Sequence, residues 1–125
     1  ASGSSFGTLM AVAFMTLAKE TAGKLEMPVA DIAPLIGKVN DSLMVRGRST
    51  LGDKTALDSL ETIRKAVQEV RDQENLHRAA TRAASEAIEA FRMQPNKIGR
   101  ARMFADKSIG LPDPGMVAVA RIIGP

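Results

Sequence analysis

The sequence predicts an all-α fold, an antiparallel helical bundle of about five helices. Apolar residues recur every three or four positions in several segments, as expected for the buried face of a helix. The core must be built from Ala, Leu, Ile, Val and Met, because there are four Phe and no Trp or Tyr. This composition favours closely packed helices over a β-sandwich. At 125 residues, the chain is expected to form a single domain over residues 1–125.

The first expected helix covers Phe6–Ala18, in a stretch that stays uncharged until Lys19. A helix that is apolar on all sides is expected to be buried within a bundle. The segment is shorter than the roughly 20 apolar residues that cross a membrane. It also lacks the basic leader and the cleavage site of a signal peptide. Because cysteine is absent as well, which fits a reducing compartment, we expect a cytoplasmic protein with no membrane span.

The second and third expected helices flank a glycine-containing loop. The second begins near Asp31 with Pro34 in its first turn, and its buried face consists of Ile32, Ile36, Val39 and Leu43. It ends at the loop Arg46–Gly52. The third begins at Asp53, the expected N-cap, and ends near Arg71. Its apolar stripe consists of Leu57, Leu60, Ile63, Val67 and Val70.

The fourth expected helix, Leu76–Met93, follows a short connection and should therefore run antiparallel to the third. Its apolar side is rich in alanine, which allows close packing: Ala80, Ala83, Ala84 and Ala87. The helical periodicity stops at Gln94, and a long loop follows. Asp113 and Pro114 then predict a helix start, with Asp as N-cap and Pro at the first helical position. The last helix is expected over Met116–Ile123.

The loop before the third helix has some features of a phosphate-binding P-loop. Gly47 and Gly52 enclose four residues, and Lys54 and Thr55 follow. However, Asp53 stands where the P-loop lysine should directly follow the second glycine, and the preceding segment is predicted to be helix rather than strand. We interpret the loop as a helix start whose first-turn N–H groups can meet an anion.

Composition narrows the classes of function. Without cysteine, disulfides, Cys-ligated zinc and thiol catalysis are excluded. The net charge of +3 and the pI near 9.6 admit nucleic acid as a partner. The basic residues are interspersed with acidic ones and few aromatic side chains are available for base stacking, which disfavours that partner. His77 is the single histidine, and we interpret it as a surface residue because it has no second ligand nearby.

Three motifs occur in order along the chain: Ala-Ser-Gly-x-x-Phe-Gly-Thr at 1–8, Gly-Asp-Lys-Thr-x-Leu-Asp at 52–58, and Gly-Arg-Ala-Arg…Ser-Ile-Gly-x-x-Asp-Pro-Gly at 99–115. Together they resemble the nucleotide-binding L subunit, or L domain, of dihydroxyacetone kinases. The resemblance covers the whole chain.

The resemblance implies a closed eight-helix barrel, of which this chain would form part, with ADP or ATP bound at one end. In the phosphotransferase-linked form of the family, bound ADP is rephosphorylated by a phosphohistidine protein. The phosphate then passes to dihydroxyacetone on a separate K subunit. In the ATP-dependent form, the ATP exchanges, and related kinases act on other small ketoses such as erythrulose. The implied function is the nucleotide-binding subunit of a small-ketose kinase in glycerol metabolism.

Transferred position by position, the resemblance assigns nucleotide binding to Ala1, Ser2, Gly47, Ala56, Arg100, Asp113, Pro114 and Gly115. Ala1 and Ser2 would meet the phosphates at a helix start. Arg100 would reach a phosphate or the ribose edge. At the position of Ala56 a family member can place a Met against the base. Residues 105–107 read Ala-Asp-Lys where Gly-Glu-Arg is commoner.

The resemblance also implies two Mg²⁺ ions, held by an Asp cluster in an N-terminal segment that would precede this chain. We therefore expect no catalytic and no metal-binding residue within this sequence, and a truncated L domain that is inactive on its own in phosphoryl transfer. A bundle that lacks helices would expose apolar faces and self-associate. Two alternatives stay open: a non-catalytic helical interaction module, and a basic nucleic-acid-binding domain.

Overall fold

The computed structural model describes residues 15, 28–47, 50–95 and 109–124, and within these ranges it contains helices and no strand. A 3-10 helix, η1 (Val29–Asp31), precedes four α-helices: α2 (Ile32–Gly47), α3 (Ala56–Val67), α4 (Gln73–Phe91) and α6 (Pro114–Ile123). The predicted all-α class is therefore confirmed. The helix expected over Phe6–Ala18 lies outside the described residues except for Met15, which is helical and exposed. None of the described helices is both long and apolar enough to cross a bilayer.

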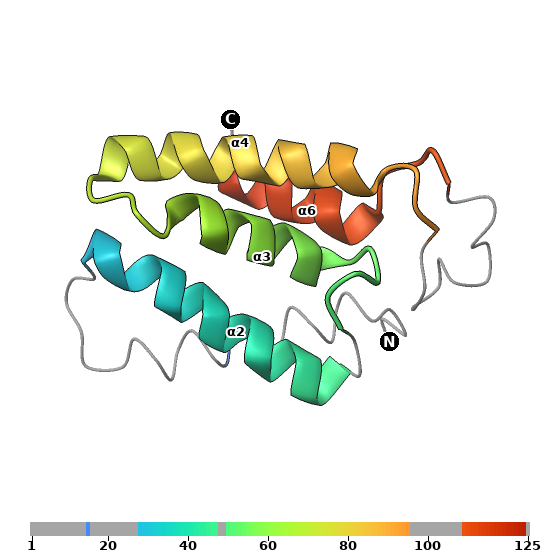
Figure 1. Ribbon diagram of the computed structural model, residues 1–125, viewed down its shortest axis with the longest axis horizontal. Coiled ribbons are helices and arrows are strands. Elements are labelled where there is room, and N and C mark those ends of the chain that lie inside the picture. Colours follow the sequence, from blue (N-terminus) through green and yellow to red (C-terminus); the bar gives the residue numbers. More distant parts are fainter. Residues whose placement is uncertain (1–14, 16–27, 48–49, 96–108, 125) are drawn as a thin grey trace.

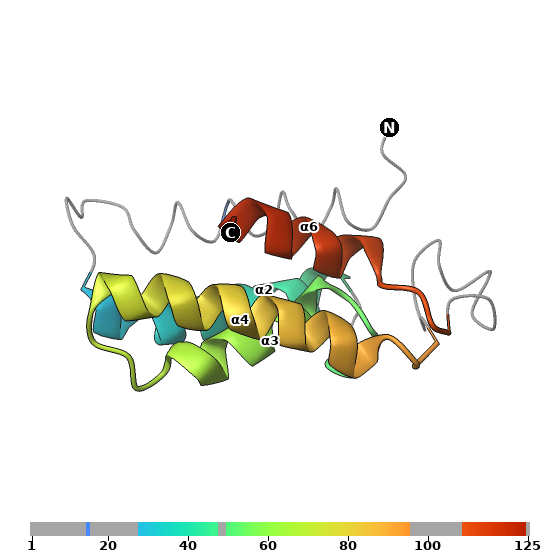
Figure 2. The same cartoon turned by 90° about the horizontal axis from the view of Figure 1, so that it is seen from above.

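The helices α2, α3 and α4 lie side by side, each antiparallel to the next, and α6 packs on α3 and α4 (Figures 1 and 2). This arrangement brings the starts of α3 and α6 to the same end of the bundle as the ends of α2 and α4. We call it the N-cap end, after Thr55 and Asp113, which are the N-caps of α3 and α6.

Small side chains on α4 allow α3 to pack closely against it. Ala83, Ala84 and Ala87 are each 1% exposed, as the alanine-rich face predicts. The buried core that joins α2, α3, α4 and α6 consists of Ala33, Ala56, Ile63, Val67, Ala83, Ala84 and Val119. Because most of these side chains are small, the helix axes can lie near each other and the backbone groups of neighbouring helices come within reach of side chains.

The predicted start of the third helix is wrong. It begins at Ala56 with Thr55 as N-cap, rather than with Asp53. The hydroxyl oxygen of Thr55 accepts a hydrogen bond from the Leu57 N–H (3.2 Å), and Oδ2 of Asp58 accepts one from the Thr55 N–H (2.9 Å). The Thr55 side chain also accepts from the Asp58 N–H, and this reciprocal pairing is a capping box, which requires a side-chain acceptor three positions after the N-cap. Asp58 fulfils that requirement for Thr55 and not for Asp53.

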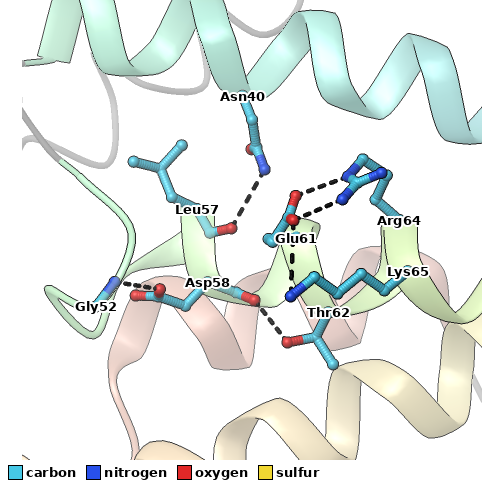
Figure 3. A network of polar contacts seen from close by, with 8 residues as sticks. All are labelled: Asn40, Gly52, Leu57, Asp58, Glu61, Thr62, Arg64 and Lys65. Carbon is cyan, nitrogen blue, oxygen red and sulfur yellow. Dashed lines mark hydrogen bonds and ion pairs between the residues drawn. The ribbon is translucent and has the colours of Figure 1, made fainter.

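Two carboxylates shape the loop before α3. Oδ1 of the buried Asp58 accepts a hydrogen bond from the Gly52 N–H at 2.6 Å (Figure 3). Asp53 closes the preceding turn by accepting from the Thr50 N–H at 3.0 Å. The backbone is left-handed at Gly52 (φ 98°) and at Lys54 (φ 65°). A left-handed lysine is uncommon, so the loop's hydrogen bonds must stabilise this conformation.

The other helix boundaries differ from those predicted by a few residues. The third helix ends at Val67 rather than near Arg71, and the fourth begins at Gln73 rather than Leu76. The physical reason is the side chain of Asp72, which caps α4 by accepting a hydrogen bond from the Asn75 N–H at 3.1 Å. An N-cap has extended backbone angles, so neither helix can continue through it. The last helix has Asp113 as N-cap and Pro114 in its first turn, as predicted, so it begins at Pro114, two residues before the predicted Met116.

We expect Asp58→Ala to lower the free energy of unfolding by about 3 kcal/mol, because it removes a charged acceptor from two backbone donors and breaks the capping box. Chemical denaturation measures this loss. Asp53→Ala is the matched control: it removes a loop carboxylate in an exposed turn and should cost under about 1 kcal/mol. Equal losses for the two variants would contradict the role assigned to Asp58.

We expect Ala84→Leu to destabilise the bundle by about 1–3 kcal/mol, since the additional carbon atoms have no space between the packed helices. Ala90→Leu introduces the same atoms at an exposed position of α4 and should leave the stability within about 0.5 kcal/mol. Thermal melts followed by circular dichroism compare the two. A melting point for Ala84→Leu equal to that of the unsubstituted chain would show that α3 and α4 do not pack as closely as described.

Candidate functional site

The N-cap end brings together two helix starts that the sequence analysis associates with anion or nucleotide binding. The starts of α3 and α6 lie at this end in both views (Figures 1 and 2). The third start, near Ser2, lies outside the described residues. The ends of α2 and α4 are at the same place, so this end combines helix termini of opposite polarity.

Lys54 joins the loop before α3 to the end of α4. Its side chain is fully buried, with 0% exposure. Its Nζ donates hydrogen bonds to the carbonyl oxygens of Arg92 (3.1 Å) and Gln94 (2.7 Å). The Gly110 N–H also donates to the Arg92 carbonyl, at 2.7 Å. The carbonyls that follow α4 are thus satisfied by Lys54 and by the residues that lead into α6, rather than left open at the helix end.

Asp113 starts α6 and lies near the charge of Lys54. Its Oδ2 accepts a hydrogen bond from the Met116 N–H at 3.0 Å, and the side chain is buried. Burial lowers the pKa of the Lys54 ammonium, the charge of Asp113 opposes that shift, and the charge of Arg92 adds to it. The Arg92 guanidinium is paired with Glu89 at 2.6 Å. The buried cation is therefore balanced by a nearby anion and by hydrogen bonds to two backbone carbonyls, as an interior charge requires.

The structure places the described members of the predicted site near this end. Gly47 is the last residue of α2, and Ala56 is the first residue of α3, where it is buried in the core. Pro114 is exposed and Gly115 is half-buried in the first turn of α6. Three predicted members lie outside the described residues: Ala1, Ser2 and Arg100.

The structural role of Lys54 as a buried side chain in the turn before α3 was not predicted from the sequence. Lysine is seldom buried, so its place after Asp53 was noted only as a departure from the P-loop pattern. A usable signal was present in the spacing of Thr55 and Asp58, which matches a capping box. That spacing moves the helix start by two residues and leaves Lys54 in the turn rather than in the helix.

A hollow lies between α2 and α3, with a volume of about 510 Å³. Its polar lining includes Asn40, Glu61 and Arg64 (Figure 3). Arg64 binds the Glu61 carboxylate through two hydrogen bonds of 2.7 Å and lowers the pKa of that carboxyl. Asn40 donates to the Leu57 carbonyl at 3.4 Å. None of the residues that line this hollow belongs to the predicted nucleotide site.

A metal cluster is not found in the described part of the chain. Within residues 28–47, 50–95 and 109–124, no group of three or more His, Asp or Glu side chains could hold an ion. His77 is exposed, with Nε2 3.3 Å from the Ile123 carbonyl oxygen, as expected of a surface histidine. These ranges therefore contain no set of ligands that would fit the Mg²⁺ ions implied by the resemblance.

Known proteins match the chain over most of its length. A D-erythrulose kinase of Mycolicibacterium smegmatis is 36% identical over 71% of this chain and 16% of its own length. An L-erythrulose kinase of Pectobacterium atrosepticum is 30% identical over 97% of this chain and 21% of its own. The PEP-dependent dihydroxyacetone kinase ADP-binding subunit DhaL of Escherichia coli is 29% identical over 95% of this chain and 57% of its own.

The chain thus spans about a fifth of the length of these erythrulose kinases and somewhat more than half of the ADP-binding subunit. No solved structure matches it significantly. The family match extends over residues 1–124 and includes each of the three motifs and every described helix. The chain belongs to the DAK2 domain family, whose matched members are kinases of small ketoses or a nucleotide-binding subunit of one.

Proposed function

We propose that this chain is the nucleotide-binding part of a small-ketose kinase and that it binds ADP or ATP at the N-cap end. The observation that carries the proposal is the meeting of the α3 and α6 starts with the buried Lys54 ammonium. Helix starts attract anions through their unpaired N–H groups and their dipoles. The name of the DhaL relative, an ADP-binding subunit, supports the same ligand.

In this proposal the residues around the start of α6 approach the nucleotide. Pro114 and Gly115 are accessible in its first turn, and Gly115 leaves room for a ligand because it has no side chain. Gly47 contributes from the end of α2. Ala56 is 6% exposed, so its part is to support the site from the core. Ala1, Ser2 and Arg100 complete the proposed set.

Phosphoryl transfer requires a ketose as acceptor, and we propose that a K-type partner subunit holds it, in the cytoplasm. The relatives named as erythrulose kinases are several times longer than this chain, which fits a division of labour between a nucleotide domain and a ketose domain. The phosphate donor is either exchangeable ATP or a phosphohistidine protein. Retention of prebound ADP through gel filtration would favour the phosphohistidine donor, and rapid exchange would favour ATP.

We expect ADP to stabilise the chain thermally, because a ligand that binds only the folded state adds about 2.7 kcal/mol at a hundredfold excess over its Kd. Differential scanning fluorimetry with ADP, ATP and adenosine measures the shift. Salt-dependent retention on DNA without any nucleotide effect would instead support a nucleic-acid-binding domain. If neither ligand had an effect, the chain would be a helical interaction module.

We expect Arg100→Ala to weaken ADP binding by about 10- to 100-fold, the usual loss for a charge-assisted hydrogen bond to phosphate. Isothermal titration calorimetry gives the two dissociation constants. Arg121→Ala removes an exposed arginine near the opposite end of α6 and should change the affinity less than twofold. An unchanged affinity in Arg100→Ala would remove Arg100 from the site.

A further inference from the structure

Antiparallel packing creates an electrostatic conflict at the N-cap end. The starts of α3 and α6 present the positive ends of their helix dipoles there, whereas α4 presents its negative end, with carbonyl oxygens. An anion bound beside α6 would therefore be attracted by one helix terminus and repelled by a neighbouring one. A positive charge that faces the α4 carbonyls would weaken the repulsion and leave the attraction by the α6 start dominant.

Lys54 is placed to resolve this conflict. Its Nζ contacts the carbonyl oxygens of Arg92 and Gln94 at 3.1 and 2.7 Å, so a positive charge lies directly on the negative end of α4. The same Arg92 carbonyl accepts the Gly110 N–H at 2.7 Å, three residues before the N-cap of α6. The lysine thus offsets the negative end of α4 and shares the Arg92 carbonyl with the segment that leads into α6.

We propose that Lys54 is a positioning residue that gives the N-cap end its preference for the phosphates of a nucleotide. The inference rests on the proposed nucleotide-binding function. Lys54 has 0% exposure, so it acts through the carbonyls of Arg92 and Gln94 and through the start of α6, not by contact with the ligand.

The charged groups around Lys54 are consistent with this assignment. Asp113 is the nearby anion, and its carboxylate is also committed to the Met116 N–H. Arg92 is the nearby cation, but Glu89 pairs with its guanidinium. Lys54 therefore offsets both the dipolar carbonyls and the charge of Asp113, and its removal would leave both uncompensated beside the site.

The effect of Lys54 on ligand affinity can be measured because it depends on the charge of the ligand. Removing the ammonium should weaken the binding of ADP, which carries phosphates, while adenosine, which lacks them, should be affected much less. A purely structural role would predict similar losses for both ligands. The ratio of the two dissociation constants therefore separates phosphate preference from a general loss of the fold.

The experiment compares Lys54→Met with Lys65→Met in the 125-residue chain. The control makes the same chemical change on the exposed face of α3, where the Lys65 side chain is 69% exposed. Calorimetry with ADP and with adenosine should show a loss of about tenfold or more for ADP and under about threefold for adenosine in Lys54→Met. Lys65→Met should leave both affinities unchanged. Equal losses for the two ligands, or none, would overturn the proposal.

A second measurement on the ligand-free chain separates this inference from the proposed function. Amide hydrogen exchange at Gly110 and Met116 should be about tenfold faster in Lys54→Met than in Lys65→Met. Unchanged exchange would show that Lys54 does not hold the start of α6, whatever the chain binds. If the unsubstituted chain binds neither ADP nor adenosine, the proposed function is wrong, and so is the proposed phosphate preference.

Two further variants keep the test decisive. Lys54→Arg retains the cation and should largely restore the ratio of ADP to adenosine affinity. If Lys54→Met does not fold, Lys54→Gln, which is neutral but can still donate, is compared with Lys54→Arg at low temperature. A ratio that is the same in the neutral and the cationic variant would contradict the inference.

Discussion

The buried carboxylate of Asp58 is the constraint on which the N-cap end depends. One oxygen accepts from the Gly52 N–H and the other from the Thr55 N–H, so a single side chain sets both ends of the turn that contains Lys54. A buried carboxylate is tolerated only when its acceptors are satisfied. Because the turn is fixed in this way, Lys54 can keep a left-handed backbone that a free loop would rarely adopt.

The alanine-rich face of α4 is the second feature on which the structure of the N-cap end depends. Lys54 reaches the carbonyls of Arg92 and Gln94 because α3 and α4 pack through side chains as small as those of Ala83, Ala84 and Ala87. Larger residues would separate the helices by more than the lysine side chain could accommodate at both hydrogen bonds. The packing of the core and the polar contacts at the bundle end are therefore one structural feature, and a change in the first is transmitted to the second.

The sequence was sufficient for the elements whose signals are local. The alanine periodicity of α4 and the Asp113–Pro114 start of α6 were confirmed, since N-cap and first-turn preferences act within a few residues. The start of α3 was misplaced because Asp53 and Thr55 are both good N-caps, and only the partner at position 58 distinguishes them. The burial of Lys54 depends on carbonyls 38 and 40 residues away, which no local pattern reveals. The proposed members of the nucleotide site came from the family resemblance, and periodicity alone would not have suggested them.

The departure from the P-loop pattern now has a physical meaning. In a P-loop the lysine follows the second glycine directly and reaches the phosphates of the nucleotide. Here Asp53 intervenes, and Lys54 is directed into the protein, onto the end of α4. Similar residue types in a similar order thus serve two different strategies: a lysine that contacts the ligand, and a lysine that removes an unfavourable helix end from the ligand's surroundings. The second strategy is needed where antiparallel helices meet, because every such end includes carbonyl termini beside N–H termini.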